Sequence, residues 1–277
     1  MPDRPNLHVL LFAPPGSGKS HFAATFPKPL LVLAFDPVGK MTAYYERGEP
    51  SPEQEGAVGQ GVVTVTSKRT YKLIEQVEFY HDDELTRDGG MVPVAYERFL
   101  ARLPLLYDEV REGKWKTVVL DSLTPMKLAS HNLHHYKLNK TDKDERRWDK
   151  LATDDLEQAL CCRLTTLRCN VIIIAHVDKD KDEVAGIVVG QPAAPGRLSR
   201  SDGLAARYPE LYTIRTKRDP SNKGRILRTL QTQPDASFNC MSVQIDAPDG
   251  ILLNDDAGGG KVGYTSLWEN YDAKHGS

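Results

Sequence analysis

The chain has 277 residues, of which 40% are hydrophobic and 27% are charged, and its formal net charge is −2 at pH 7. This length accommodates one large α/β domain whose core needs neither a disulfide nor a structural metal. The nearly neutral charge excludes nucleic-acid binding through the overall electric field and leaves local basic patches for that purpose. No apolar run approaches the roughly 20 residues of a membrane-spanning helix. We expect no signal peptide, because the first apolar stretch, Leu7–Phe12, is too short for one. The four cysteines form no CxxC pair, which is typical of a reducing compartment, and we expect a cytoplasmic protein without membrane contacts.

Short apolar runs alternate with helical patterns along the first two-thirds of the chain. Buried strands are predicted at Leu7–Phe12, Leu30–Phe35, Thr117–Leu120 and Val171–Ala175, with a shorter strand at Val62–Thr66. Helices are predicted at Ser20–Phe26, Tyr71–Phe79, Tyr96–Glu112 and Leu156–Leu167. The polar stretches Glu46–Gly61 and His81–Gly90 are predicted as surface connections. Buried strands separated by helices favour an α/β fold with a mostly parallel sheet and helices on both faces.

The pattern changes after residue 176. Strands are predicted at Ile187–Val189, Leu211–Thr216 and Ile226–Gln231, with turn residues and no long helices between them. These late strands favour an antiparallel extension of the sheet at one edge. The tail after Pro248 is rich in Gly and Asp, and we expect it to be ordered only in part, with Trp268 and Tyr271 able to dock.

The segment Ala13-Pro14-Pro15-Gly16-Ser17-Gly18-Lys19-Ser20 lies between the first predicted strand and the first predicted helix. It matches the phosphate-loop pattern GxxxxGK[ST], except that Ala13 stands where the first Gly is usual. Backbone N–H groups of such a loop surround the β-phosphate of a nucleotide at the start of a helix. We expect this whole segment to bind the phosphates of ATP, with Lys19 on the β- and γ-phosphates and Ser20 on Mg²⁺. Ala13 fits this loop where its φ angle stays negative.

Acidic or polar residues follow three other predicted strands. Asp121 ends a strand that we expect to neighbour the phosphate-loop strand, where it would hold Mg²⁺ as a Walker B aspartate does. Asp36 is the best-placed residue to orient or deprotonate the attacking water, with a helix cap as the alternative. His176 is a candidate sensor of the γ-phosphate, with a purely structural histidine as the alternative.

Together these motifs resemble the RecA-like branch of P-loop ATPases, and more narrowly the phage-encoded single-strand annealing proteins of the Sak group and their phage nucleotide-binding relatives. The resemblance rests on Pro15–Ser20, Thr117–Thr124, Ile174–His176, Tyr212–Thr216 and Leu230–Thr232. It implies a RecA-like ATPase core at residues 1–235, followed by a C-terminal extension at residues 236–277. RecA-like proteins place a catalytic Glu just beyond the second strand, where this chain has Val38. Either Asp36 takes that role or hydrolysis is slow.

The resemblance also implies two loops that bind single-stranded DNA, at about Lys137–Lys150 and Val177–Arg200. Basic side chains in these loops would neutralise phosphates, and an aromatic side chain would stack on a base. Acidic residues are interspersed in the first segment, so a solvated helix face is the alternative there. The candidate DNA-binding residues are Lys140, Arg146, Arg147, Trp148, Arg197 and Arg200.

Arg215 and Lys217 stand two residues apart on a late strand and therefore point to the same face. In several RecA-like ATPases such a basic pair reaches the γ-phosphate held by the neighbouring subunit and stabilises the transition state. The resemblance thus implies a homo-oligomer, either a ring or a filament. An exposed basic strand face is the alternative.

The sequence therefore favours an ATP- and Mg²⁺-dependent ATPase of phage type that binds single-stranded DNA in recombination or annealing, alongside a single-strand DNA-binding protein. One alternative is an ATP-binding assembly or regulatory module that hydrolyses little, which Val38 favours. Another is a small-molecule P-loop kinase, for which the sequence offers no convincing lid or acceptor pocket.

Overall fold

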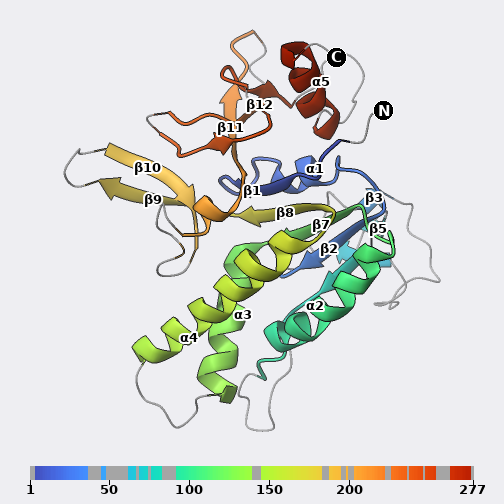
Figure 1. Ribbon diagram of the computed structural model, residues 1–277, viewed down its shortest axis with the longest axis vertical. Coiled ribbons are helices and arrows are strands. Elements are labelled where there is room, and N and C mark those ends of the chain that lie inside the picture. Colours follow the sequence, from blue (N-terminus) through green and yellow to red (C-terminus); the bar gives the residue numbers. More distant parts are fainter. Residues whose placement is uncertain are drawn as a thin grey trace.

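The structure is a computed structural model that describes residues 4–36, 45–47, 62–66, 69–73, 76–82, 92–138, 145–182, 187–194, 198, 203–221, 226–235, 237–245, 247–253 and 263–275. Its main sheet has the strand order β14-β12-β11-β1-β8-β7-β2-β6, and β13 pairs with β11 (Figure 1). The parallel part consists of β1 (His8–Phe12), β2 (Leu30–Ala34), β6 (Gln76–Phe79), β7 (Thr117–Asp121), β8 (Asn170–Ala175) and β11 (Glu210–Arg218).

The antiparallel part of the main sheet extends it beyond β11. It consists of β12 (Ile226–Gln231), β13 (Met241–Ser242) and β14 (Ile251–Leu252). The predicted fold class, a mostly parallel sheet flanked by helices with antiparallel strands toward the C-terminal side, is confirmed.

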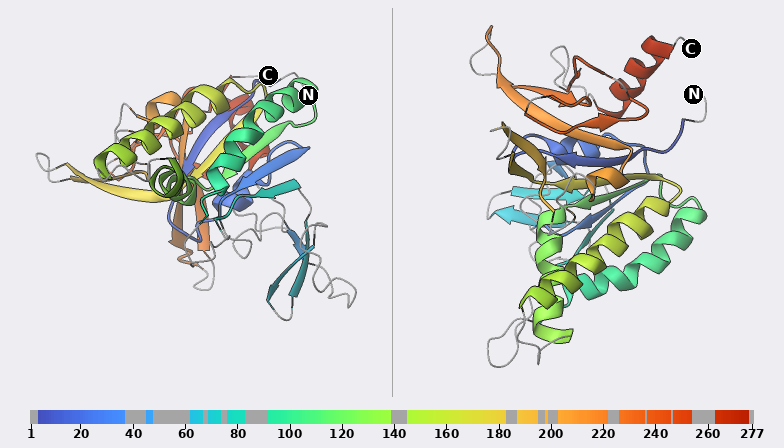
Figure 2. Two further views of the ribbon diagram at one scale, coloured as in Figure 1. Left: turned by 90° about the horizontal axis from the view of Figure 1, so that it is seen from below. Right: turned by 60° about the vertical axis from the view of Figure 1, so that its left-hand side comes forward.

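Helices cover both faces of the main sheet (Figure 2). One face carries α2 (Ala95–Arg111), α3 (Leu123–Leu133) and α4 (Glu145–Glu157), with short π- and 3₁₀-helical turns η4 (His134–Leu138), η5 (Gln158–Arg163) and η6 (Leu164–Thr166). The other face carries α1 (Lys19–Ala23) and α5 (Tyr264–His275). Both faces are thus removed from water, which explains why the central strands read as continuous apolar runs.

Alternate residues of β1 supply the two halves of the core. Leu10 and Phe12 pack in the cluster that includes Phe99 of α2, whereas Val9 and Leu11 pack in the cluster that includes Phe22 of α1. Successive side chains of a strand point to opposite faces, so one apolar run serves both layers. Each such buried side chain contributes about 1.5–3 kcal/mol of hydrophobic free energy relative to an exposed one.

The helix predicted at Tyr71–Phe79 is wrong, because the structure has two strands there. β5 (Arg69–Leu73) joins β3 (Tyr45–Arg47) and β4 (Val62–Thr66) in a small antiparallel sheet, which projects from the main body in the left panel of Figure 2. β6 forms the edge of the main sheet. Val77 and Phe79 pack on the cluster beside α1, while Glu78 faces α2, and this alternation with a period of two is that of a strand.

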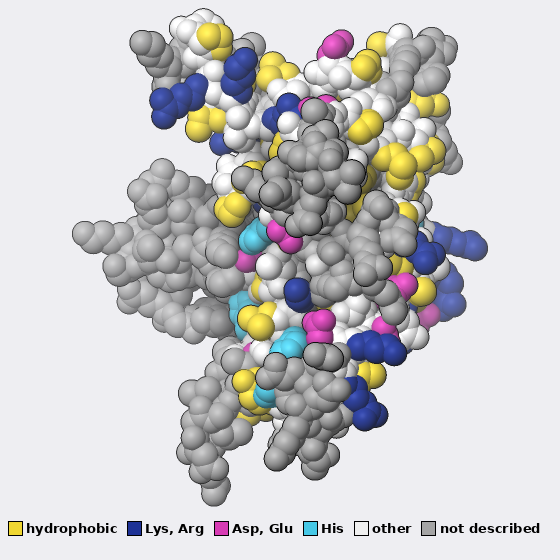
Figure 3. Space-filling view, turned by 90° about the vertical axis from the view of Figure 1, so that its left-hand side faces the viewer, with side chains coloured by type: hydrophobic (Ala, Val, Ile, Leu, Met, Phe, Trp, Pro, Cys, Tyr) yellow, Lys and Arg dark blue, Asp and Glu magenta, His cyan; other side chains and the backbone are white. Residues whose placement is uncertain are grey.

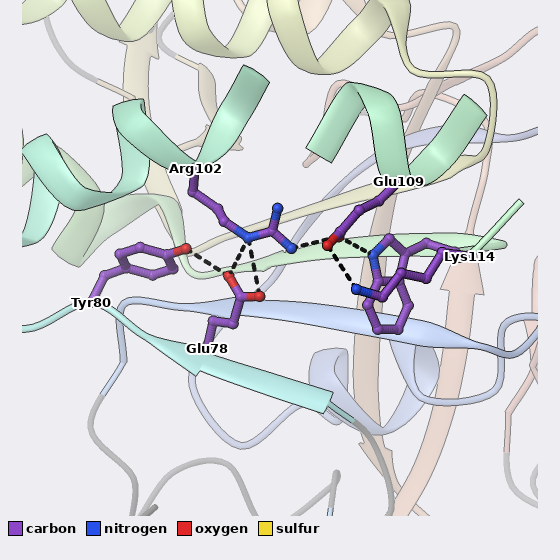
Figure 4. A network of polar contacts seen from close by, with 6 residues as sticks. Glu78, Tyr80, Arg102, Glu109 and Lys114 are labelled. Atoms are coloured by element: carbon purple, nitrogen blue, oxygen red, sulfur yellow. Dashed lines mark hydrogen bonds and ion pairs between the residues drawn. The ribbon is translucent and has the colours of Figure 1, made fainter. Parts of the chain in front are cut away.

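An ion-pair network ties β6 to α2 (Figure 4). Arg102 Nε donates to Glu78 Oε2 at 2.9 Å, and Arg102 Nη2 donates to Glu109 Oε2 at 2.6 Å. Lys114 and Trp115 also donate to Glu109. Burial acts to raise the pKa of Glu109, but the hydrogen bonds from Arg102, Lys114 and Trp115 outweigh it and lower that pKa to about 2. The network therefore stabilises the ionised carboxylate and fixes the helix on the sheet edge.

The segment predicted as a second DNA-binding loop, Val177–Arg200, is in part a β-hairpin. β9 (Val177–Asp182) pairs antiparallel with β10 (Ile187–Pro192), and the hairpin extends to the left in Figure 1. The strand predicted at Ile187–Val189 is confirmed within β10. Backbone pairing between β9 and β10 satisfies the polar groups that a loop would leave to solvent.

Residues beyond 236 add to both the sheet and the second core. Backbone N–H groups of Val243 and Gln244 donate to the buried carboxylate of Glu210 on β11, the latter at 2.8 Å, which fixes β13 beside β11. On α5, Trp268 is 1% exposed and packs with Tyr271 in the cluster beside α1. Among the described residues, no helix has the length and apolar character needed to cross a membrane.

Candidate functional site

Four neighbouring parallel strands end side by side at one edge of the main sheet. In the order β1-β8-β7-β2, Leu11 is in register with Ile174, Ile174 with Asp121, and Asp121 with Ala34. The loop after β1, the residue after β8, the end of β7 and the residues after β2 therefore form one continuous row. This is the edge of a parallel sheet at which ligands generally bind.

The prediction that the Asp121 strand neighbours the phosphate-loop strand is wrong. β8 pairs with β1 on one side and with β7 on the other, so it lies between them. Its apolar side chains Ile172 and Ile174 are buried against α1, and Val171 and Ile173 are buried on the opposite face. A strand that is apolar on both faces fits at the centre of the sheet. As a result, His176 lies between the phosphate loop and Asp121.

The loop backbone turns through two glycines. Gly16 and Gly18 have φ angles of +75° and +99°, values that L-residues with a side chain rarely adopt. No described residue other than glycine has a positive φ, so Ala13 has the negative φ that lets it replace the usual glycine of the loop. The helix that follows, α1, is shorter than the predicted Ser20–Phe26 and ends at Ala23.

Lys19 lies folded back into the loop. Its ammonium donates to the carbonyl oxygens of Ala13 and Pro14 at 2.8 and 3.1 Å, and the residue is 7% exposed. Burial lowers the pKa of Lys19, whereas the nearby carboxylates of Asp121 and Asp36 act to raise it. The lysine is thus the cation at the centre of the loop, and an anionic phosphate there would offset its desolvation.

The hydroxyl of Ser20 and the carboxylate of Asp121 meet directly. Ser20 Oγ donates to Asp121 Oδ2 at 2.7 Å, and Asp121 is 3% exposed. A hydroxyl and a carboxylate oxygen are hard ligands of the kind that Mg²⁺ takes in company with waters and nucleotide phosphates. The described residues contain no cluster of three or more His, Cys, Asp or Glu that could hold a metal by themselves. The Ser20 hydroxyl and the Asp121 carboxylate together suit a Mg²⁺ ion whose other ligands are nucleotide phosphates and waters.

Asp36 is held at the same edge by contacts with β7. Its carboxylate accepts a 2.6 Å hydrogen bond from Ser122 Oγ, and its backbone N–H donates to the carbonyl of Asp121 at 3.2 Å. Asp36, Asp121, Ser122 and His176 line one cavity of about 330 Å³ together with the phosphate loop. The structure thus brings together the loop and all three of the strand-end residues predicted from the sequence.

The other predicted residues lie away from this cavity or outside the described part of the chain. Arg215 and Lys217 are exposed on β11; Arg215 pairs with Asp235 and lies over the ring of Phe238, with 5.1 Å to its centroid. Arg147 is exposed on α4. The structure describes only the backbone of Arg146 and Trp148, and Val38, Lys140, Arg197 and Arg200 lie outside the described residues.

One residue beside the loop was missed by sequence reasoning. Arg228 of β12 places its Cδ and Nε atoms 3.2 and 3.4 Å from the position that a Cβ on Gly18 would occupy. The signal was present in the alternation of β12, because buried Leu230 shares a face with Arg228 and packs on the side of α1. The sequence alone does not reveal the strand order that brings β12 near the loop.

A family model described as an AAA domain matches residues 5–191 of the chain. The chain belongs to the AAA domain family. The match includes the phosphate loop, Asp36, Asp121 and His176, whereas Arg215, Lys217 and Arg228 lie beyond it. Membership implies a P-loop nucleotide site, which agrees with the geometry of the cavity.

Other comparisons add little to this AAA domain assignment. No curated protein sequence matches the chain significantly. Among solved structures, it is similar to a KaiC-like protein from the hyperthermophilic archaeon Pyrococcus horikoshii OT3, with a TM-score of 0.36 and 15% identity. That likeness covers 81% of this chain and 76% of the archaeal one.

Proposed function

We propose that this protein binds ATP with Mg²⁺ in the cavity beside the phosphate loop and hydrolyses it. The observation that carries the proposal is the 2.7 Å contact between Ser20 of the loop and Asp121 of β7, next to the buried ammonium of Lys19. A hydroxyl, a carboxylate and a lysine in this arrangement match the phosphate and Mg²⁺ contacts of P-loop nucleotide hydrolases.

Each residue of the cavity has a role in this proposal. Lys19 and the backbone N–H groups of the loop would bind the phosphates, and Ser20 and Asp121 would hold Mg²⁺. The bound Mg²⁺ would neutralise phosphate charge. Asp36 would orient the attacking water or accept its proton, and His176 would contact the terminal phosphate from its place between the loop and Asp121.

The binding part of the proposal is tested by removing the loop lysine. Lys19→Ala should abolish ATP binding or turnover, whereas Lys127→Ala, which removes an exposed lysine on α3, should leave both unchanged. Calorimetric titration with Mg·ATP measures the first quantity and phosphate release the second. Hydrolysis by Lys19→Ala at the wild-type rate would refute the site assignment.

The alternative, an assembly or regulatory module that hydrolyses little, is distinguished by rate. A single-turnover ATPase measurement is made with and without single-stranded DNA. Clear stimulation by DNA supports a DNA-dependent ATPase, and no turnover under either condition supports the module.

We further propose that the protein binds single-stranded DNA and acts in recombination or annealing. The support for this is the resemblance carried by Thr117–Thr124 and the late strands, and the exposed Arg147 on α4. Binding of a labelled oligonucleotide, measured over a range of salt concentrations with and without a non-hydrolysable ATP analogue, tests it. Binding that responds to neither salt nor nucleotide would contradict it.

A homo-oligomer, either a ring or a filament, is the assembly that we propose for hydrolysis. The proposed assembly is supported by the basic end of the β11–β12 ribbon, where three residues are exposed: Arg215, Lys217 and Arg218. Lys and Arg side chains gather at the top of the face in Figure 3, at the height of this ribbon. Arg215 and Lys217 lie outside the cavity of their own subunit, so they can act on phosphate only across a subunit boundary. Turnover per subunit should then rise with protein concentration, and a rate that is independent of concentration would contradict the assembly.

A further inference from the structure

Arg228 approaches the phosphate loop from β12, at Gly18. Its Cδ and Nε atoms would lie 3.2 and 3.4 Å from a Cβ on Gly18, so the arginine side chain reaches the loop where the loop has no side chain. The contact is directed by the sheet. Arg228 lies opposite Thr216 in the antiparallel register, and the next pair on that face, Ile214 and Leu230, is buried beside α1.

The basic residues of the neighbouring strand do not share this position. Arg215 is one residue before Thr216 and so points to the other face of the ribbon, where it lies over Phe238. Arg218 shares the face of Arg228, but it lies opposite Ile226, one pair farther from Leu230, and is exposed. Among the described basic residues of the β11–β12 ribbon, Arg228 is therefore the one placed at the phosphate loop of its own subunit.

The charge of the cavity leaves a role for such a cation. Its described lining residues include one lysine, Lys19, against the two carboxylates of Asp36 and Asp121. A nucleoside triphosphate is strongly anionic, and a guanidinium binds phosphate oxygens through charge-assisted, often bidentate hydrogen bonds. Arg228 is half-buried at the loop, where such a bond is less screened by solvent than at the open surface.

We propose that Arg228 is a further nucleotide-binding residue, whose guanidinium contacts the phosphate chain from the β12 side of the loop. Lys19 and Arg228 then hold the phosphates between them. The antiparallel extension of the sheet, which lies beyond the AAA domain match, thereby completes the nucleotide site. This inference rests on the proposed nucleotide binding by the same loop.

The test is the affinity of the full chain for Mg·ATP, Mg·ADP and adenosine, measured by calorimetry or by competition. Arg228→Ala and Arg228→Gln should weaken ATP and ADP about 10- to 100-fold, as expected for the loss of a hydrogen bond between charged groups. Adenosine affinity should not change. Gln keeps much of the stem that packs on Gly18 and removes the charged guanidinium, so it separates a phosphate contact from packing. The thermal midpoint without nucleotide confirms that each variant is folded.

Arg207→Ala is the matched control, because it removes an exposed arginine beside Cys161 and the cluster on the opposite face of the sheet. It should bind all three ligands as the wild type does. Wild-type ATP affinity in Arg228→Gln, or a parallel loss of adenosine and ATP affinity, would overturn this inference while leaving the proposed function intact. A wild-type chain that binds no nucleotide would overturn the proposed function itself.

Discussion

The Ser122 hydroxyl donates a 2.6 Å hydrogen bond to the Asp36 carboxylate. Ser122 directly follows β7, and Asp36 lies two residues after the end of β2. Both residues are buried, at 1% and 6% exposure. The bond fixes the Asp36 side chain beside the phosphate loop. If Asp36 orients the attacking water, Ser122 is the residue that positions it.

Removal of the Asp36 carboxylate should lower turnover more than removal of its hydrogen-bond donor. We expect Asp36→Asn to reduce kcat by about 10²-fold or more, the typical contribution of a general base, and Ser122→Ala to reduce it about tenfold. ATP affinity should stay within about threefold of the wild type in both, since neither residue belongs to the loop. Phosphate release and equilibrium binding separate the two quantities.

Ser130→Ala is a suitable control for that comparison. Ser130 is also fully buried and donates to the carbonyl of Ala152 at 3.2 Å, but it lies between α3 and α4. Its loss should cost about 1 kcal/mol of stability and leave kcat unchanged. A drop in kcat for Ser130→Ala equal to that for Ser122→Ala would attribute both effects to general loosening of the structure.

The Mg²⁺ dependence should report on Ser20 and Asp121. Each of Ser20→Ala and Asp121→Asn should raise the Mg²⁺ concentration needed for half-maximal turnover by about tenfold or more, because each removes an oxygen ligand or its partner. Because the two side chains contact each other at 2.7 Å, their effects should not add in the double variant. Fully additive effects would indicate that the two residues act independently.

The Glu109 network predicts a specific loss of stability in acid. The pKa of Glu109 is lowered from 4.5 to about 2 in the folded protein, so its ionised carboxylate favours folding. This stabilisation is complete above the unfolded pKa and disappears as the pH falls through the folded value. Glu109→Gln should therefore lower the free energy of unfolding at neutral pH and flatten its decline between about pH 5 and pH 2, as measured by urea titration.

The exposed pair between Asp108 and Arg111 provides the control for this prediction. These side chains are 59% and 78% exposed, and such pairs contribute about 0–1 kcal/mol. Asp108→Asn should leave both the stability and its pH dependence nearly unchanged. A pH profile of Glu109→Gln that matches the wild type would contradict the assignment of acid sensitivity to this network.

The docking of α5 depends on Trp268. Trp268→Ala should lower the free energy of unfolding by about 3–5 kcal/mol, the usual cost of emptying a large buried site. Trp268→Phe should cost much less, because the indole N–H has no hydrogen-bond partner among the described residues. Glu269→Ala, at an exposed position of the same helix, should be nearly neutral. Equal losses for the Phe and Ala variants would show that burial of aromatic surface is not what anchors the helix.

Local patterns were sufficient to predict much of the site. The phosphate loop, the four central strands, Asp36, Asp121 and His176 were all readable, because glycine placement and apolar runs act over a few residues. The helix predicted at Tyr71–Phe79 was wrong because the spacing of its few apolar residues fits both the helical and the strand period. Only the segments that it packs against determine which of the two forms. Val77 and Phe79 face one core and Glu78 meets Arg102 of α2, and that contact spans elements distant in sequence.

The sequence by itself determined the residues of the phosphate loop: Gly16 and Gly18, which the turn requires, and Lys19 and Ser20, which we propose bind phosphate and Mg²⁺. Only the tertiary structure decided which residues meet that loop. The insertion of β8 between β1 and β7 sets His176 beside the loop, and the pairing of β11 with β1 and β12 brings Arg228 onto Gly18. Strand order follows from the burial of both faces of each strand at once, a condition on the whole sheet rather than on any one segment.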